Sequence, residues 1–344
     1  MKNLLNRLLL CMALVAVPAL AEEAPLEEAP LDEVTLKNGS RILGTLTDVR
    51  DGVLTVETDF AGTLSISADQ VSAVKANSAL TLLMADSTVI EDVPLVVEDG
   101  RLLVESGTGY AVTDLAIVNP APWELGEGYN WTGVVEAGLV IQRGNTDTDE
   151  LNYKLESIWQ STRDRYTLKF QGEDDETNGQ KSADNWRLNA KYDYFLEDPD
   201  YWGVQLLLEE DKFTDLKLRT LVGPYIGRQF LAEPILTFAA EVGIAYVDED
   251  FVSVEDQDYM SATWAFKSTS DYLGADSQLY FDQTGIWNLD NTSDIIVKSI
   301  FGVSVPLLAN ISGAAEILLE YDSGVPDGID ELDQTYRFRL GYTW

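Results

Sequence analysis

The feature that most constrains this chain is a regular alternation of apolar and polar residues from residue 131 to the C-terminus. In the first stretch, apolar or small side chains occupy the odd positions from Trp131 to Ile141, while Thr132, Glu136 and Gln142 lie on the other face. A period of two indicates a β-strand with two different faces, and segments of about ten such residues are typical of transmembrane β-barrels. A soluble sandwich does not need so many charges on one regular face. We therefore predict an all-β chain whose C-terminal part, residues 131–344, is an antiparallel transmembrane β-barrel.

The alternating stretches number about twelve, with ten and fourteen as alternatives. Short turns such as 162–164 and 308–310 alternate with mostly longer, acidic connections such as 173–184 and 248–258. Outer-membrane barrels have this asymmetry, with short periplasmic turns and longer external loops, and an even strand count returns both barrel ends to the periplasm. The predicted strands are residues 131–142, 150–161, 165–173, 185–196, 201–210, 215–229, 235–247, 259–268, 271–283, 294–306, 311–322 and 334–344.

The C-terminus carries a second, independent signal. Apolar side chains occupy alternate positions up to a final aromatic residue, the pattern that barrel-assembly machinery reads, with a tryptophan where most such proteins end in phenylalanine. The residues of this predicted assembly signal are Tyr336, Phe338, Leu340, Tyr342 and Trp344. Aromatic residues also gather at the predicted periplasmic strand ends, as rings at a membrane interface do; these are Tyr129, Trp131, Trp159, Tyr166, Tyr194, Tyr201, Trp202, Phe230 and Trp344.

The N-terminal residues read as an export signal. Lys2 and Arg7 precede an apolar run over 8–20, and Ala19 and Ala21 put small residues at the two positions that a signal peptidase reads. This run is too short to span a bilayer as a helix, so we predict that residues 1–21 are a cleaved signal peptide. Residues 22–33 are acidic, contain two prolines and cannot bury a core, so we interpret them as a solvated linker.

Residues 34–118 contain an internal repeat with an offset of 48. The stretch 49–58 recurs as 97–106, with Val, Asp, Gly, Leu, Val and Glu in common, and each copy reads as a strand, an Asp-Gly turn and a second strand. Two units of this kind resemble tandem small SH3-like β-barrels, which we expect in the periplasm, followed by a linker over 119–130. These units carry almost no basic residues, so a structural or protein-docking role is favoured over nucleic-acid binding.

The composition excludes several classes of function. The chain has no histidine and one cysteine, Cys11, which lies inside the predicted signal peptide, so histidine-based catalysis and cysteine-ligated metals are absent. The net charge of −36 argues against nucleic acid as a partner. Acidic runs such as 147–149 and 248–250 lack a glycine-punctuated calcium loop, which favours solvated loops. We predict no enzymatic activity, no cofactor and no metal site.

Charged residues recur on the predicted inward face of the barrel, ten basic against nine acidic. Two interpretations stay open: a narrow aqueous pore lined by acid and base ladders, or a lumen closed by salt bridges. The basic residues are Lys154, Lys169, Arg187, Lys191, Lys217, Arg219, Lys267, Lys298, Arg337 and Arg339. The acidic residues are Glu136, Glu156, Asp193, Glu209, Glu241, Asp276, Asp282, Glu316 and Glu320.

Several short motifs of the barrel resemble those of one family, the YdiY-like, salt-induced outer-membrane proteins, also known as the family of unknown function numbered 481. The motifs are residues 144–148, 192–196 and 211–216, the pair Gly223 and Gly227, and residues 321–323 with Pro326 and Asp333. The resemblance spans most of 131–344. It implies an outer-membrane barrel and no particular activity.

We therefore expect a Gram-negative outer-membrane protein whose N-terminal part lies in the periplasm. Its expected partners are outer-membrane lipid, the barrel-assembly machinery and an unidentified periplasmic protein. The favoured function is a narrow or gated channel, weakly cation-selective because acidic loops ring its outer mouth. The alternative is a closed barrel that anchors a periplasmic docking domain.

Overall fold

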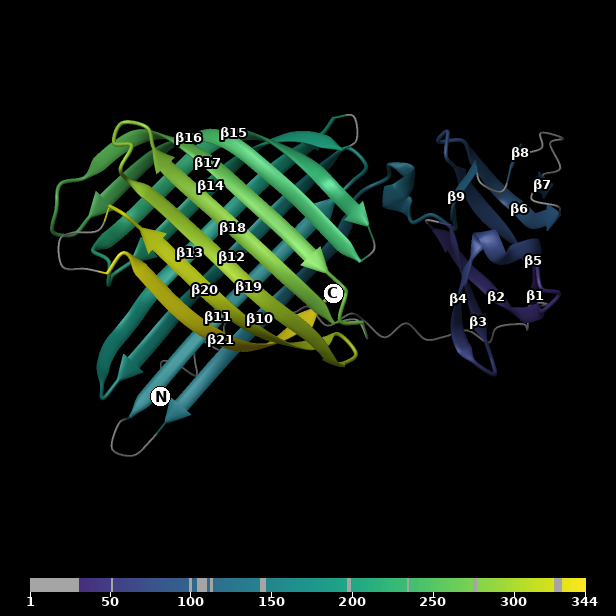
Figure 1. The fold of residues 1–344 in the computed structure, drawn as a ribbon, viewed down its shortest axis with the longest axis horizontal. Helices are drawn as coiled ribbons and strands as arrows, with labels where there is room; N and C mark the ends of the chain where they lie inside the picture. The colour runs from purple at the N-terminus through teal and green to yellow at the C-terminus, as the bar shows by residue number, and fades with distance from the viewer. Residues whose placement is uncertain are drawn as a thin grey trace. The chain divides into compact units, whose positions relative to one another are not determined.

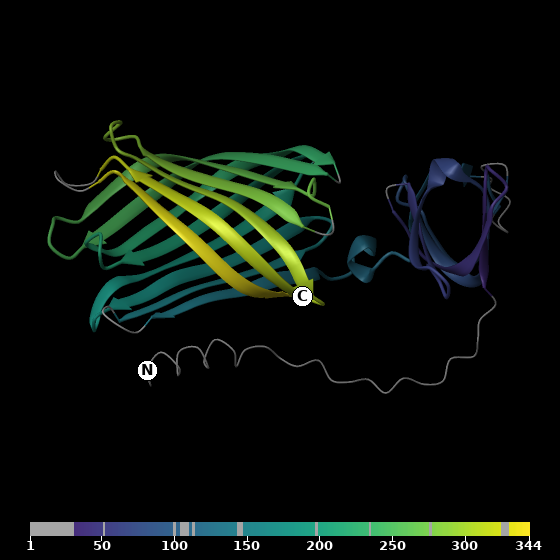
Figure 2. The same cartoon turned by 60° about the horizontal axis from the view of Figure 1, so that its bottom comes forward.

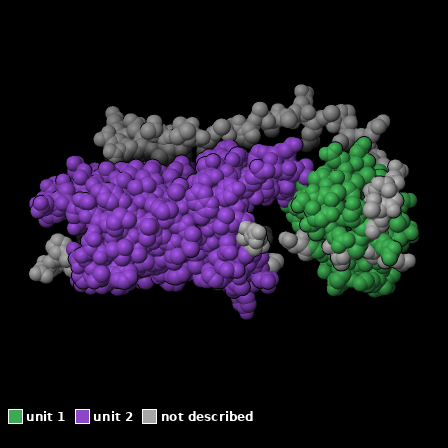
Figure 3. Space-filling model, turned by 90° about the horizontal axis from the view of Figure 1, so that it is seen from above, with its two compact units in different colours: residues 1–120 green, residues 121–344 purple. Residues whose placement is uncertain are grey.

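The computed structural model describes residues 31–50, 52–98, 101–103, 110–111, 114–142, 147–196, 199–233, 235–274, 277–324 and 330–344. The chain separates into two compact units, one ending at Pro120 and the other beginning at Ala121 (Figure 3). The predicted signal peptide and most of the predicted linker lie outside the described residues. Among the described helices, none has the length and apolar character needed to cross a membrane.

The second unit is a closed ring of twelve antiparallel strands, β10 to β21, in which each strand pairs with its neighbours in sequence (Figure 1). A short 3-10 helix, η3 (Pro122–Leu125), precedes the ring. This confirms the predicted barrel and its strand number. The strands are β10 (Asn130–Gln142), β11 (Thr148–Gln160), β12 (Asp164–Thr177), β13 (Gln180–Phe195), β14 (Asp200–Asp211), β15 (Leu216–Glu233), β16 (Leu236–Phe251), β17 (Gln257–Ser270), β18 (Gln278–Asn288), β19 (Ile295–Leu308), β20 (Ile311–Asp322) and β21 (Leu332–Thr343).

The two faces of the barrel wall differ as the alternation predicted. In β21, Phe338 is 74% exposed on the outside, whereas its neighbours Arg337 and Arg339 are 8% and 6% exposed. Aromatic rings pack against one another near the short-turn ends of the strands: Trp131 is stacked on Trp159, with ring centroids 6.3 Å apart. In this part of β21 the exposed side chains are apolar and the buried ones are charged, the reverse of a strand in a soluble protein.

Several strands extend further than predicted at the end opposite the short turns. Residues 173–184, expected to be mostly loop, form the ends of β12 and β13 joined by Asn178 and Gly179, both at positive φ as a tight hairpin turn requires. The ninth barrel strand was placed wrongly, at 271–283. It is β18, because a turn at Asp271–Gly274, with Gly274 at φ 67°, delays the strand to Gln278.

The ring closes between its first and last strands over a short distance. Four residue pairs join β10 to β21, from Val134 with Thr343 to Ala137 with Leu340, and each of the other eleven seams has at least ten. Trp344 adds two reciprocal backbone hydrogen bonds with Gly133, both 3.1 Å. Beyond Ala137, no backbone pair joins the described residues of these two strands.

The first unit is a sheet of nine strands in the order β4-β3-β2-β1-β5-β6-β7-β8, with β9 pairing β2 and β5; Figure 1 labels these strands, and Figure 2 shows the sheet curving round on itself. Asp32 and Glu33, predicted in the linker, are the first residues of β1. The strands are β1 (Asp32–Leu36), β2 (Arg41–Arg50), β3 (Val53–Thr58), β4 (Gly62–Ser67), β5 (Val71–Met84), β6 (Val89–Glu98), β7 (Arg101–Leu103), β8 (Tyr110–Ala111) and β9 (Leu115–Val118), with the 3-10 helix η1 (Ala68–Gln70) before β5.

The sequence repeat is visible in the core of this unit. Val34 in β1 and Leu82 in β5, 48 residues apart, are both fully buried, and the equivalent pair Leu54 and Leu102 is buried as well. Both copies contribute to one hydrophobic cluster and share β5, so they form one joined sheet where we expected two separate barrels. The shared strand explains the difference, because its first half pairs with β1 and its second half with β9. The SH3-like character of each copy stays a prediction.

Candidate functional site

The candidate site is the interior of the barrel, where alternate side chains from all twelve strands converge. Most of the predicted inward charges lie there in ion pairs. Lys217 does not: its side chain is 66% exposed and pairs with Asp250 at 3.6 Å. The register of β15 shifts at this point, between Leu216 and Leu218, and the β-bulge inverts the alternation on which the prediction rested. Predicted Asp276 lies outside the described residues.

Glu209 on β14 is the centre of an ion cluster in the half of the barrel away from the short turns. Its carboxylate accepts hydrogen bonds of 3.0 Å from Arg187 and from Arg219, and lies 3.7 Å from the ammonium of Lys298. Glu249 pairs with Arg219 as well. The side chains of all these residues are at most 15% exposed. Lys298 stands on β19, five strands from β14, so this cluster crosses the lumen.

An apolar cluster fills the neighbouring part of the interior. Leu207, Leu221, Ala245 and Val247 are buried inside the barrel, together with Tyr259 and Ile286. Tyr259 donates a hydrogen bond of 3.3 Å to Glu249, which joins the apolar cluster to the ion cluster. Side chains from β14 to β18 therefore occupy this half of the lumen.

A third group of contacts lies behind the short seam between β10 and β21. Arg339 on β21 pairs with Glu136 on β10 at 3.2 Å and with Glu316 on β20 at 2.7 Å. It also donates to Asn152 on β11 at 3.0 Å. Lys154 completes the group at 3.3 Å from Glu136. Side-chain ion pairs therefore link the first and last strands where the backbone ladder between them is short.

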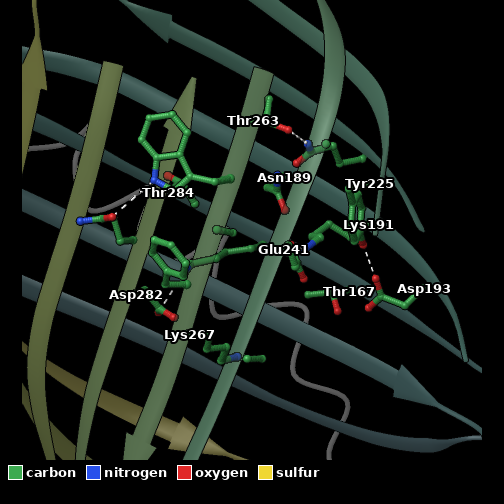
Figure 4. Close-up of a pocket in the computed structure, with 18 of the residues that line it drawn as sticks. Thr167, Asn189, Lys191, Asp193, Tyr225, Glu241, Thr263, Lys267, Asp282 and Thr284 are labelled. Carbon is green, nitrogen blue, oxygen red and sulfur yellow. Dashed lines mark hydrogen bonds and ion pairs between the residues drawn. The ribbon is translucent and has the colours of Figure 1, made fainter. Parts of the chain in front are cut away.

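A cavity of about 630 Å³ occupies the other half of the lumen (Figure 4). Its lining extends to Ala232, Thr237 and Thr269, next to the short turns, so it lies toward that end of the barrel. Tight pairs stand in its wall: Arg165 with Asp193 at 2.7 Å, and Lys191 with Glu241. Tyr201 donates to Glu241 at 3.0 Å, and Tyr225 donates to Asp193.

Four further charges of this cavity bridge opposite walls of the ring. Lys169 on β12 lies 4.0 Å from Asp282 on β18, and Lys267 on β17 lies 3.8 Å from Glu156 on β11. Lys169 is also 4.0 Å from Glu156. In a ring of twelve, strands six apart are diametrically opposed, so these contacts cross the full width of the lumen. We call Glu156, Lys169, Lys267 and Asp282 the bridging quartet.

Sequence reasoning missed three inward charges. Arg165 and Glu173 were placed at the limits of a strand predicted too short, and Glu249 was assigned to an acidic loop. Arg165 lies four residues before Lys169, on the same face, and this spacing would have identified it. Glu249 belongs to β16, which continues to Phe251, and it is 2% exposed. Glu173 accepts from Arg337 on β21 at 2.6 Å.

The predicted assembly signal forms the outer face of β21. Tyr336, Phe338 and Leu340 are more than 60% exposed, and Tyr342 is 38% exposed. The ring of Trp344 packs edge-on against Trp131 at 5.7 Å. The final residue thus contacts the first strand of the barrel. Whether this strand is read during assembly stays a prediction.

Comparison with known proteins finds a matching family model, a related protein and several similar solved structures. Residues 135–344 match the model of the family described as "Protein of unknown function, DUF481". The uncharacterized protein YdiY of Escherichia coli (strain K12) is 25% identical over 111 residues, which are 32% of this chain and 44% of that protein, so the match spans under half of the relative.

Among solved structures, the NanC porin is 14% identical, with a TM-score of 0.40 over 62% of this chain and 98% of that one. The translocator domain of the autotransporter NalP from Neisseria meningitidis is 11% identical, with a TM-score of 0.36 over 63% and 88%. The fold itself, a closed antiparallel ring that is apolar outside and charged inside, is the architecture of an outer-membrane β-barrel. From the family match over residues 135–344, the chain belongs to the DUF481 family.

Proposed function

We propose that this protein is an outer-membrane barrel, closed in its resting state, that anchors its N-terminal β-sheet unit on the periplasmic side. The apolar outer surface and the aromatic residues near the short turns support a position in the membrane. The even number of strands supports the orientation, because both ends of the barrel then lie at the short-turn side, which is periplasmic in barrels of this kind.

One observation carries the closed state: ion pairs join opposite walls of the lumen. Contacts between β12 and β18, and between β11 and β17, span the ring near its middle. The cluster around Glu209 and the adjacent apolar cluster occupy the other half. A barrel of twelve strands has a modest interior that side chains can fill. Solute would therefore have to displace charged and apolar side chains to pass.

Planar-bilayer recording of the refolded full chain tests this proposal. The wild-type protein is expected to show no sustained current at low voltage. A variant carrying Leu207→Ala, Leu221→Ala and Tyr259→Ala removes much of the apolar cluster and is expected to conduct. Heat-modifiable migration on a detergent gel serves as the folding control for both. Steady ohmic current through the wild-type barrel would refute the closed state.

The second candidate function is a gated, weakly cation-selective channel. The cavity on the short-turn side supports it, because an access chamber already occupies half of the lumen. Acidic residues at the opposite strand ends, such as Asp248, Asp256 and Asp258, are exposed and concentrate cations over about 10 Å in dilute salt. If voltage opens the channel, the reversal potential in a KCl gradient should indicate cations, and changing these three residues to Asn should reduce it. An anion-selective potential would contradict this candidate.

The anchoring role implies a partner for the N-terminal unit. Its low content of basic residues argues for a protein partner over nucleic acid. Cross-linking in intact cells, with the full chain compared with a chain lacking residues 34–118, tests this role. A protein captured by the full chain alone supports docking, and identical captured proteins from both chains would count against it.

A further inference from the structure

The ion pairs of the bridging quartet are longer than other ion pairs inside the barrel. Its ion pairs measure 3.8 to 4.0 Å, whereas Arg165 with Asp193 and Arg339 with Glu316 measure 2.7 Å. Among the described residues, no hydrogen bond involves Lys169, Lys267 or the two carboxylates of the quartet. Nitrogen–oxygen distances near 4 Å lie outside hydrogen-bond range. Two ammonium groups and two carboxylates thus keep their hydrogen-bonding capacity free.

These free groups all face the cavity on the short-turn side, with other polar side chains around them. Asn189, Thr167 and Thr284 line the same space, and their side chains make no hydrogen bond within the described part of the chain (Figure 4). The cavity leaves these groups accessible to water: Lys267 is 59% exposed and Asp282 is 30% exposed, so water can occupy the hydrogen-bonding positions that no protein group fills. Convergent polar groups that have no hydrogen-bond partner in the protein are typical of a site where a ligand replaces water.

The size and position of the cavity suit a small-molecule ligand. Its volume of about 630 Å³ falls within the range of small-molecule pockets, roughly 300–1,000 Å³. The lining reaches the residues beside the short turns, so a ligand enters from that end of the barrel. Apolar side chains such as Ile158, Phe266 and Ile300 form much of the wall beside the charged groups, as is usual for a small-molecule pocket.

The charge pattern of the quartet selects the class of ligand. Two positive and two negative groups sum to zero, so a ligand with a net charge would leave an unpaired charge in the lumen, which is costly. A ligand with one carboxylate and one ammonium group pairs with both kinds at once and preserves neutrality. We propose that the cavity is a binding site for a small zwitterion of the amino-acid type, whose carboxylate binds Lys169 and Lys267 and whose ammonium binds Glu156 and Asp282.

This inference does not depend on whether the barrel conducts, and a binding measurement tests it. Isothermal titration of the refolded full chain in detergent uses three zwitterions of increasing charge separation: L-alanine, β-alanine and γ-aminobutyrate. Acetate and methylammonium are the single-charge controls. At least one zwitterion is expected to bind about tenfold more tightly than either control. Equal or tighter binding of acetate or methylammonium, or binding of none of the five, would overturn the proposal.

Two variants locate the site, each with a matched control. Lys169→Gln and Glu156→Gln are expected to weaken zwitterion binding about tenfold, because each removes one half of a charge pair. Lys217→Gln at the exposed bulge and Glu210→Gln on the outer face make the same chemical changes away from the cavity and should leave binding unchanged. The ligand series on the wild-type chain decides the question if a variant does not fold. Unaltered binding to folded Lys169→Gln and Glu156→Gln proteins would refute the assignment.

Discussion

Replacing Glu209 with Gln removes one negative charge from the centre of the ion cluster while keeping the shape of the side chain. Its carboxylate holds Arg187 and Arg219 at 3.0 Å each, with Lys298 at 3.7 Å. Arg219 retains Glu249 as a partner, and Lys298 retains Glu320. Arg187 has no other carboxylate partner within the described residues, and its Nε atom is buried without a hydrogen bond. The variant thus leaves one buried guanidinium without a direct ion-pair partner.

The loss of stability expected for Glu209→Gln follows from these contacts. At 3.0 Å and an effective dielectric constant of 20, each charge pair has a gross attraction of about 5.5 kcal/mol, part of which the desolvation of the charges offsets. Removing one partner of a buried pair costs about 3–5 kcal/mol in measured cases. We therefore expect Glu209→Gln to lower the free energy of unfolding by about 3 kcal/mol. With a slope of about 3 kcal/mol per M, this shifts the urea midpoint by about 1 M.

The neighbouring residue supplies a matched control. Glu210 faces the other side of the wall, where it accepts a hydrogen bond of 2.8 Å from Trp186 and lies 3.4 Å from the exposed Lys212. Glu210→Gln keeps the acceptor and loses an exposed ion pair, a change of about 0–1 kcal/mol. Tryptophan fluorescence during urea unfolding of barrels in lipid vesicles measures both variants. Equal midpoints for the two variants would refute the reasoning about the cluster.

Two further predictions concern the seam and the last residue. In a chain without Cys11, cysteines at Val135 and Tyr342, which are paired across the seam, should form a disulfide. Cysteines at Ile141 and Tyr336, four residues beyond the last pair, should not, and efficient cross-linking of this second pair would show that the ladder continues. Deleting Trp344 removes its hydrogen bonds with the first strand and its aromatic contact, so the yield of heat-modifiable barrel should fall, and an unchanged yield would contradict both the structural and the assembly role.

The alternation of apolar and polar residues predicted the barrel, but it did not show for every residue whether its side chain faces the lumen or the outside. A period of two is maintained only while each strand pairs without interruption, and the bulge at Lys217 reverses it at one end of β15. The same limit applies to strand ends. Glu249 was assigned to a loop because acidic residues usually lie in solvent, whereas here a long strand turns it toward Arg219. Local composition cannot reveal a partner that stands on another strand.

The contacts across the lumen could not be predicted from the sequence, for a related reason. Which inward residue meets which depends on the stagger of all twelve strands, because a shift of one strand moves its side chains along the barrel axis. The near-balance of inward charges predicted that ion pairs would form. It did not predict that Lys169 would reach Asp282 on the opposite wall, or that an apolar cluster including Leu221 would fill the space beside Glu209.

The distribution of tight and loose pairs indicates where this interior would change first. Around Glu209, short charge-assisted hydrogen bonds and an apolar cluster exclude water, so opening that half requires the loss of several contacts at once. In the bridging quartet, contacts of 3.8 to 4.0 Å are exchanged with water or a ligand at little cost, since Lys267 is 59% exposed. Ligand entry from the short-turn side is therefore compatible with a barrel that stays closed toward the other end. Conductance and binding can then be measured as separate properties of the same lumen.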